Sequence, residues 1–200
     1  MIPEIGQFAL IIALCLTFCL GCFAFLGAHK DNPEYMAQVS PLTHAQFIFV
    51  VVAFFCLAYS FLVDDFSVLY VASNSHSELP TLFKFSAVWG AHEGSLLLWI
   101  LILTIWMVLV ANFSKALPRP FISRVLGVLG LLNFGFLLFT LMTSNPFERI
   151  YPAPFNGSDL NPLLQDIGLA IHPPILYMGY VGFAVAYAFA VAVMLSGKLD

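Results

Sequence analysis

The sequence alternates between long apolar stretches and shorter polar segments. Five apolar stretches are about 20 residues long and contain no Asp, Glu or Lys. They contain one Arg, Arg124, which stands at the start of the fourth stretch, where its side chain can reach the membrane interface. The hydrocarbon core of a bilayer, about 30 Å thick, is crossed by about 20 residues of α-helix. The pattern therefore predicts five transmembrane helices, at residues 5–27, 43–63, 95–113, 122–143 and 174–196.

The composition supports the same fold class. Charged residues make up 9% of the 200 positions and apolar residues 61%, whereas soluble domains carry about 25% charged residues. Lipid must surround most of the chain, so we expect an all-α integral membrane protein with two long outer loops. Lys and Arg form no cluster of the kind that binds nucleic acid. The four cysteines lie in apolar stretches and are interpreted as packing residues: Cys15, Cys19, Cys22 and Cys56.

The basic residues divide unequally between the two sides that five spans imply. Lys and Arg in short loops favour the cytoplasmic side, so the side that holds five of the seven is predicted to be cytoplasmic. Residue 200 falls on that side. The N-terminus and the outer loops, residues 64–94 and 144–173, fall in the periplasm if the membrane is the inner membrane of a Gram-negative cell. The five are Lys30, Lys115, Arg119, Arg124 and Lys198, and the other two are Lys84 and Arg149.

The first outer loop ends with the letters WGAHEG at residues 89–94. Trp89 offers a flat apolar face with one hydrogen-bond donor, which suits a planar ligand or the headgroup level of a bilayer. Adjacent side chains diverge on a helix, but in a turn between glycines His92 and Glu93 could contact a common partner. Two interpretations stay open here: a pocket or docking site, or an interfacial anchor whose polar residues cap the next helix.

The second outer loop ends in His172, Pro173 and Pro174. Proline at a helix start costs no hydrogen bond, because the first N–H groups have no partner in the helix, and its fixed φ stiffens the entry. The sequence therefore predicts that the prolines begin the fifth helix and hold His172 at a rigid corner outside the membrane. A neutral imidazole there can bind iron through one nitrogen, with Gln165, Asp166 or a backbone carbonyl orienting the other. A purely structural interfacial histidine is the alternative.

Three ordered stretches carry a more specific signal: residues 65–75 (DFSVLYVASNS), 89–99 (WGAHEGSLLLW) and 160–174 (LNPLLQDIGLAIHPP). Together they closely resemble the CcmF family of cytochrome c maturation proteins, and the likeness extends over the whole chain. The resemblance implies a heme-handling membrane protein that forms part of the cytochrome c heme lyase.

Such a protein is expected to receive heme from the chaperone CcmE and to work with CcmH- and CcmI-type subunits that handle apocytochrome c. It would help to join the heme vinyl groups to the thiols of the C-x-x-C-H motif of apocytochrome c. By its position in the family motif, His172 would be an axial ligand of the heme iron. The residues implied in a pocket or docking role are Trp89, His92, Glu93, Pro173 and Pro174.

The chain stops at Asp200, before the tryptophan-rich WWD segment and the three further heme-ligating histidines that the resemblance leads us to expect. We therefore expect a fragment or one product of a split gene, which needs the remainder of the protein and is inactive as a lyase alone. Two other functions stay open. One is a non-catalytic scaffold that docks partners of the same assembly system through its outer loops. The other is a transporter subunit, which would require a broken helix or polar residues at mid-membrane. Asn133 is the only such polar residue that the sequence suggests.

Overall fold

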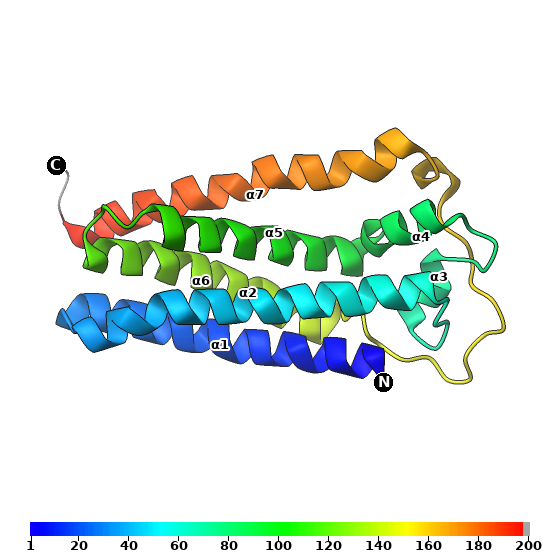
Figure 1. Cartoon of the computed structure of the whole chain (residues 1–200), viewed down its shortest axis with the longest axis horizontal. Coiled ribbons are helices and arrows are strands. Elements are labelled where there is room, and N and C mark those ends of the chain that lie inside the picture. The colour runs from blue at the N-terminus through cyan, green and yellow to red at the C-terminus, as the bar shows by residue number, and fades with distance from the viewer. Residues whose placement is uncertain (198–200) are drawn as a thin grey trace.

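Five long helices dominate the computed structural model, which describes residues 1–197 (Figure 1). They run side by side along the long axis of the molecule, and each is long and apolar enough to cross a membrane. The predicted fold class is confirmed. Lys198 and residue 200, which entered the orientation prediction, lie outside the described residues. The helices are α1 (Ile2–Lys30), α2 (Pro33–Leu62), α5 (His92–Phe113), α6 (Arg119–Thr143) and α7 (Ile167–Ser196).

The two ends of this bundle differ, and we name them by what they carry. The loop end holds the N-terminus and the two long connections, residues 63–91 and 144–166 (Figure 1). The basic end is the opposite one, where short turns join α1 to α2 and α5 to α6. Its basic residues are Lys30, Lys115, Arg119 and Arg124.

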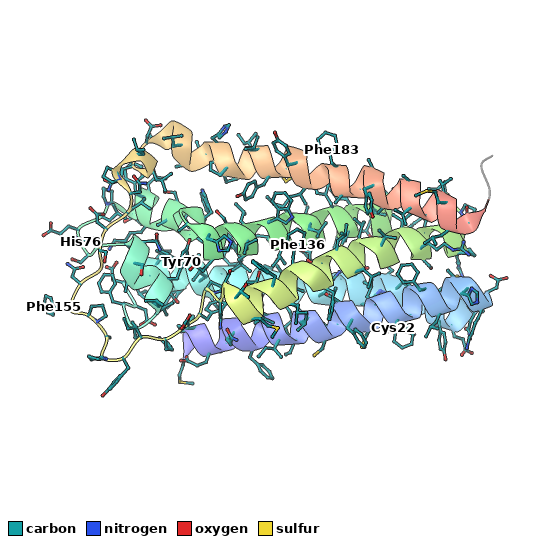
Figure 2. The ribbon with its side chains drawn as sticks, turned by 180° about the vertical axis from the view of Figure 1, so that it is seen from behind. Cys22, Tyr70, His76, Phe136, Phe155 and Phe183 are labelled. Atoms are coloured by element: carbon teal, nitrogen blue, oxygen red, sulfur yellow. The ribbon has the colours of Figure 1, made fainter. Side chains whose placement is uncertain are left out.

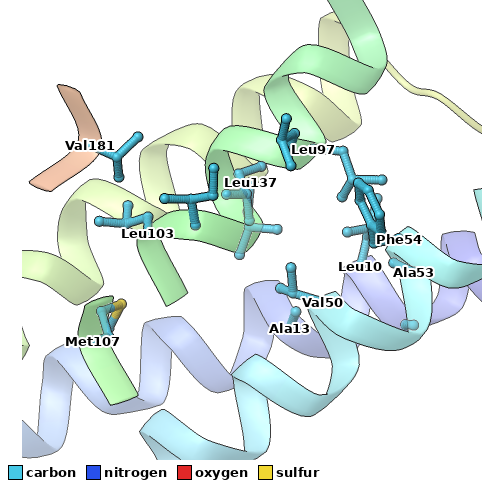
Figure 3. Close-up of a cluster of buried hydrophobic side chains, with 14 of the residues drawn as sticks. Leu10, Ala13, Val50, Ala53, Phe54, Leu97, Leu103, Met107, Leu137 and Val181 are labelled. Carbon is cyan, nitrogen blue, oxygen red and sulfur yellow. The ribbon is translucent and has the colours of Figure 1, made fainter. Parts of the chain in front are cut away.

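Small residues allow the central helices to approach one another closely. α1 packs against α2 and α6, α2 also packs against α5, and α7 lies at the edge against α5 and α6 (Figure 1). A Cβ on Gly130 of α6 would lie 2.5 Å from Leu20 Cδ2 of α1, and a Cβ on Gly127 would lie 2.9 Å from Ala24 Cβ. Such contacts are typical of membrane helices, whose association depends on close packing. Buried apolar side chains between the helices include Leu10, Val50, Leu97, Leu103 and Leu137 (Figure 3).

A buried polar cluster joins four of the helices near their middles. Gln46 of α2 accepts hydrogen bonds through Oε1 from Thr17 of α1 and, at 3.1 Å, from Asn133 Nδ2 of α6. Its Nε2 lies 3.3 Å from Met107 Sδ of α5. The four side chains are at most 1% exposed. Apart from Asn133 Oδ1, which is buried without a partner, the cluster bonds mainly within itself, so it fits a role in fixing the helix register.

The start of α2 differs from its predicted span. The helix begins at Pro33 rather than at residue 43, because the side chain of Asn32 caps it. Asn32 Oδ1 accepts hydrogen bonds from the backbone N–H groups of Glu34 and Tyr35, at 2.9 and 3.3 Å. Such a cap satisfies N–H groups that have no partner inside the helix. A count of apolar residues finds the part of a helix that lies in lipid, whereas polar caps decide where the helix begins.

The start of α7 corrects a prediction about the proline pair. The helix begins at Ile167, where the carboxylate of Asp166 accepts a hydrogen bond from the N–H of Leu169 at 3.1 Å. Pro173 and Pro174 therefore lie inside α7. The prediction that they begin the helix, with His172 at a corner before it, is wrong. His172 is a helical residue, because the Asp166 cap precedes the apolar span on which the prediction relied.

Candidate functional site

The first long connection at the loop end contains three short helices, whereas the second is irregular apart from one short 3-10 helix. The connection from α2 to α5 approaches its turn into α5 through residues that the sequence analysis singled out, and the connection from α6 to α7 lies against it (Figure 1). The short helices are α3 (Leu69–Asn74), α4 (Thr81–Ser86), η1 (Ala87–Trp89) and η2 (Pro162–Leu164).

Two sets of backbone contacts fasten these connections to one another. In the first, Val68 and Arg149 form an isolated antiparallel β-bridge. In the second, the N–H of Ser158 donates to the carbonyl oxygen of Ala72 at 2.8 Å. Backbone groups that bond one another in this way are not free to bond water or a partner. The loop end is therefore an ordered platform rather than a pair of loose loops.

A glycine makes the second contact possible. A Cβ on Gly157 would lie 2.0 Å from the carbonyl oxygen of Ser75, a clash with backbone that no side chain can relieve. The same carbonyl accepts a hydrogen bond from the N–H of Asp159 at 3.2 Å. Gly157 thus lets the second connection pass directly over the end of α3.

Both basic residues at the loop end are held in ion pairs. Lys84 Nζ lies 2.6 Å from Asp64 Oδ2, and Lys84 is only 7% exposed. Arg149 Nε donates to Glu4 Oε1 at 2.9 Å, and Arg149 Nη1 lies 3.3 Å from Asp65 Oδ2. Since each cation already has an anionic partner, both stabilise the platform and neither is left to bind an anionic ligand.

Tyr70 fixes the turn from η1 into α5. Its hydroxyl accepts a hydrogen bond from the N–H of Ala91 at 3.1 Å and lies 3.2 Å from the carbonyl oxygen of Val88. Tyr70 lies within the platform, whereas Phe155 points outwards from the second connection (Figure 2). Burial raises the pKa of the Tyr70 phenol, which keeps the hydroxyl neutral. A Cβ on Gly94 would lie 1.6 Å from the Val88 oxygen and 2.6 Å from the Tyr70 hydroxyl, so glycine is required there.

Trp89 joins the first connection to α7. Its indole Nε1 donates to the carbonyl oxygen of Ala170 at 3.0 Å. In an α-helix that oxygen would accept from the N–H four residues later, but residue 174 is a proline and has none. Pro174 therefore leaves an acceptor free on α7, and Trp89 uses it. Leu160, only 2% exposed, packs beside this contact, 3.0 Å from where a Cβ on Gly90 would lie.

His92 and Glu93 point to different partners. His92 opens α5, with its Nδ1 3.2 Å from Ser144 Oγ at the end of α6 and its ring edge-on to Phe139. Glu93 lies towards Tyr70, where its charge adds to burial in raising the pKa of the phenol. Because both residues belong to a helix, their side chains diverge. His92 thus fastens α5 to α6, and no side chain caps the start of α5.

His172 is exposed, and its side chain makes no hydrogen bond within residues 1–197. The two side chains expected to orient it have other partners. Asp166 caps α7, and Gln165 Nε2 donates to the carbonyl oxygen of Leu160 at 3.0 Å. The imidazole is therefore available to a ligand from outside the bundle.

Apolar side chains surround this imidazole on the helix surface. Residues three and four positions away share its face, and they include Leu169, Ile175 and Leu176, which are 43%, 66% and 39% exposed. We call these four residues the His172 surface. The described residues contain no group of three or more His, Cys, Asp or Glu side chains that could hold a metal ion. Iron bound at His172 would thus take its other ligands from elsewhere, as it does in a porphyrin.

Some residues of this site had no role in the sequence analysis. Tyr70 and Leu160 belong to the stretches that carried the family resemblance, but composition and spacing gave no reason to connect them. The structure brings these stretches together, through the Tyr70 hydroxyl beside residues 88–91 and through Leu160 beside Gly90. Their common order along the chain was the only available signal.

The fold and the site define a multi-pass helical membrane protein whose loop end presents an exposed histidine on an apolar helix surface. The family model described as "Cytochrome C assembly protein" matches residues 89–199, more than half of the chain. The chain therefore belongs to the cytochrome c assembly protein family.

Several relatives match the chain over its whole length. It is 56% identical over 201 residues to the cytochrome c-type biogenesis protein CcmF of Pseudomonas aeruginosa, and 50% identical over 201 residues to the CcmF of Escherichia coli. Each comparison covers 100% of this chain and 31% of the relative. Among solved structures, one described as "Cytochrome c Heme Lyase CcmF" matches with a TM-score of 0.87 and 28% identity, over 99% of this chain and 31% of the other. The chain thus spans about a third of the length of these relatives.

Proposed function

We propose that this chain is part of a cytochrome c heme lyase, and that His172 binds the iron of the incoming heme as an axial ligand. The observation that carries the proposal is the His172 surface, in which an exposed imidazole without an internal hydrogen-bond partner lies among apolar side chains. A neutral imidazole nitrogen is a common ligand of heme iron. Membership of the family supports heme as the substrate.

The geometry suits a large, flat and mainly apolar substrate. The porphyrin supplies four nitrogens to its iron, so one imidazole can complete one axial position. Leu169, Ile175 and Leu176 offer apolar contact around that position. The hydrogen bond from Trp89 to Ala170 holds this turn of α7 against the platform. A ligand held in place before binding loses less freedom when heme arrives, which strengthens binding.

The lyase reaction joins heme to apocytochrome c through two thioethers. Each thiol of the C-x-x-C-H motif adds across one heme vinyl group: the sulfur bonds to one vinyl carbon and the thiol hydrogen ends on the other, so the addition consumes no oxidant or reductant. In our proposal this chain holds and orients heme, while the remaining length of the lyase supplies the further ligands. The expected partners are the heme chaperone CcmE, CcmH- and CcmI-type subunits and apocytochrome c.

We place the reaction on the periplasmic face of the inner membrane. Among the described residues, four basic side chains lie at the basic end and two at the loop end, and a surplus of Lys and Arg favours the cytoplasm. The loop end, with the N-terminus and His172, then faces the periplasm.

Heme binding by a His172 variant tests the proposal. The protein should be purified in the full length that its gene encodes, or with the polypeptide that completes it, after exposure to heme-loaded chaperone. His172→Ala is expected to lose the low-spin absorption of the delivered heme, and free imidazole is expected to restore it. His29→Ala, which removes an exposed histidine at the basic end of α1, is the matched control and should bind heme normally. An unchanged spectrum in His172→Ala would remove this residue from the site.

A docking scaffold is the second candidate, and one feature of the loop end favours it. Tyr151 and Phe155 are essentially fully exposed, at 98% and 103%, on a segment held at both ends. Arg149 pairs with Val68 at one end, and Asn156 Nδ2 donates to Ser77 Oγ at 2.9 Å at the other. Exposed aromatic side chains on an ordered segment are typical of contact sites for proteins. The scaffold function requires that His172→Ala leave both heme binding and cytochrome c maturation intact while Tyr151→Ser/Phe155→Ser abolishes partner binding.

A further inference from the structure

A cavity of about 470 Å³ opens at the basic end, far from His172 along the bundle. It lies between α2, α5 and α6, and the turn that joins α5 to α6 forms part of its wall. Nothing in the proposed lyase function uses this cavity. Its lining combines two cations, three hydroxyl groups and an apolar wall.

The cations have no partner inside the chain. Lys115 and Arg119 are the charged residues of the lining, and neither forms an ion pair or a side-chain hydrogen bond within residues 1–197. Glu34, the acid in the first turn of α2, is not part of the lining. The cavity therefore carries uncompensated positive charge.

Two helix ends add to this positive potential. Residues in the first turns of α2 and α6 line the cavity, namely Met36, Arg119 and Ile122. The N-terminus of a helix carries partial positive charge. α6 begins after Pro118, which offers no side-chain cap, and the N–H groups of Phe121 and Ile122 donate to the Pro118 carbonyl oxygen at 3.0 and 3.1 Å.

A hydroxyl group on a buried residue faces the cavity without a partner. Ser123 is 4% exposed and lines the cavity, yet its side chain makes no hydrogen bond within the described residues. Its Oγ is not among the fully buried side-chain atoms that lack a partner, so the hydroxyl is accessible from the cavity and can donate to a ligand there. Ser40 and Ser114 contribute two further hydroxyl groups to the same lining. An acceptor with several oxygen atoms would satisfy these donors together with the cations.

The remaining wall is apolar and runs towards the centre of the bilayer. It includes Val39, Ala111 and Leu126, each at most 8% exposed. A free inorganic anion gains nothing from such a wall, whereas a phospholipid has an anionic phosphodiester joined to apolar chains. Basic pockets between transmembrane helices are known to bind such headgroups.

We propose that this cavity binds the phosphodiester headgroup of an anionic phospholipid from the adjoining leaflet. Lys115 and Arg119 pair with the phosphate, the Ser123 hydroxyl donates to one of its oxygens, and the upper acyl chain lies along Leu126. The bound lipid fills the space between α2, α5 and α6 at their basic ends and so fixes the α5–α6 turn.

Native mass spectrometry with added lipid tests the proposal on the protein in the full length that its gene encodes. We expect phosphatidylglycerol to bind at least about tenfold more tightly than phosphatidylcholine. Lys115→Gln/Arg119→Gln is expected to weaken phosphatidylglycerol binding about 25-fold, at about fivefold for each cation. Lys30→Gln, which removes an exposed cation of the same end outside the cavity, should change it less than about twofold. Ser123→Ala should weaken it about threefold or more.

Three results would overturn the lipid assignment. The two lipids could bind equally, the double variant could bind phosphatidylglycerol as Lys30→Gln does, or neither single substitution, Lys115→Gln or Arg119→Gln, could change that binding. A test with inorganic phosphate distinguishes a lipid site from a site for a free anion. If phosphate alone raised the unfolding temperature in phosphatidylcholine nanodiscs as much as phosphatidylglycerol does, the site would be one for a free anion. If the double variant failed to fold, as judged by gel filtration and circular dichroism, Lys115→Gln and Arg119→Gln would each be expected to show the fivefold loss.

Discussion

The two ends of the bundle differ in how their basic side chains are paired. At the loop end Lys84 and Arg149 pair with carboxylates, and backbone groups of the two connections bond one another. At the basic end Lys115 and Arg119 stand unpaired, within the described residues, around a cavity. Groups that the fold satisfies internally stabilise it, whereas groups that it leaves unsatisfied are available to ligands.

His172 differs from the two basic residues of the loop end, which are held in ion pairs. It lies at the loop end too, yet its imidazole has no partner in the part of the chain that the structure describes. Like Lys115 and Arg119, it is an exposed group without a partner among the described residues. The loop end then serves as a rigid platform that positions one free imidazole.

The largest expected effect tests the rigidity of that platform. Gly94→Ala would place a Cβ 1.6 Å from the carbonyl oxygen of Val88, so the turn into α5 must move. We expect a loss of about 3 kcal/mol or more in the free energy of unfolding, together with weaker heme binding at His172. Thermal unfolding in nanodiscs measures the first effect. Gly135→Ala on α6 is the control, because a Cβ there meets nothing within 4 Å; equal stability of the two variants would refute a rigid turn.

A pair of lysine variants tests the contrast between the two ends directly. Lys84→Met leaves Asp64 without its cation in a site where Lys84 is 7% exposed, and we expect a loss of about 3 kcal/mol in the free energy of unfolding. Lys115→Met removes an exposed cation that has no partner among residues 1–197 and should change stability by less than about 0.5 kcal/mol in lipid without net charge.

Adding Asp64→Asn to Lys84→Met sharpens this test. The second substitution removes the unpaired charge, so part of the lost stability should return, as measured by thermal unfolding of the single and double variants. If Lys84→Met and Lys115→Met destabilised the protein equally, the distinction between paired and free cations would fail.

A smaller effect tests the link between the platform and α7. Trp89→Phe removes the indole donor to the carbonyl oxygen of Ala170, which Pro174 cannot replace. We expect a loss of about 1 to 2 kcal/mol in the free energy of unfolding and a several-fold weaker affinity for heme. Trp106→Phe is the matched control. The Trp106 indole donates to the carbonyl oxygen of Met178 at 3.2 Å. The residue four positions after Met178 is Gly182, which, unlike a proline, has a backbone N–H that can bond this oxygen. Equal losses in the free energy of unfolding of the two variants would mean that Pro174 does not make the Trp89 hydrogen bond more stabilising.

The sequence predicted the five spanning helices because each contains about 20 apolar residues, the length that a bilayer requires. It missed where α2 and α7 begin, since Asn32 and Asp166 cap these helices outside the apolar stretches. Gln46 of the buried cluster was overlooked because one polar residue barely changes the hydropathy of its span.

The candidate site was predictable only in part. His172 could be singled out from its motif, but the contacts that support its helix join residues far apart in the chain, such as Trp89 with Ala170. Nor did the apolar pattern reveal that Pro174 lies inside α7 and frees that carbonyl. Periodicity and spacing describe local structure, whereas these contacts depend on how the helices pack.

An exchange of the axial ligand tests whether the His172 imidazole bonds to heme iron. His172→Met keeps a side chain that can bind iron but replaces nitrogen by sulfur. Measured by redox titration on the full-length protein loaded with heme, the midpoint potential of the delivered heme should rise, because methionine ligation favours reduced iron, and a sulfur-to-iron absorption band should appear. An unchanged potential and spectrum would mean that the iron is bound elsewhere and not by residue 172.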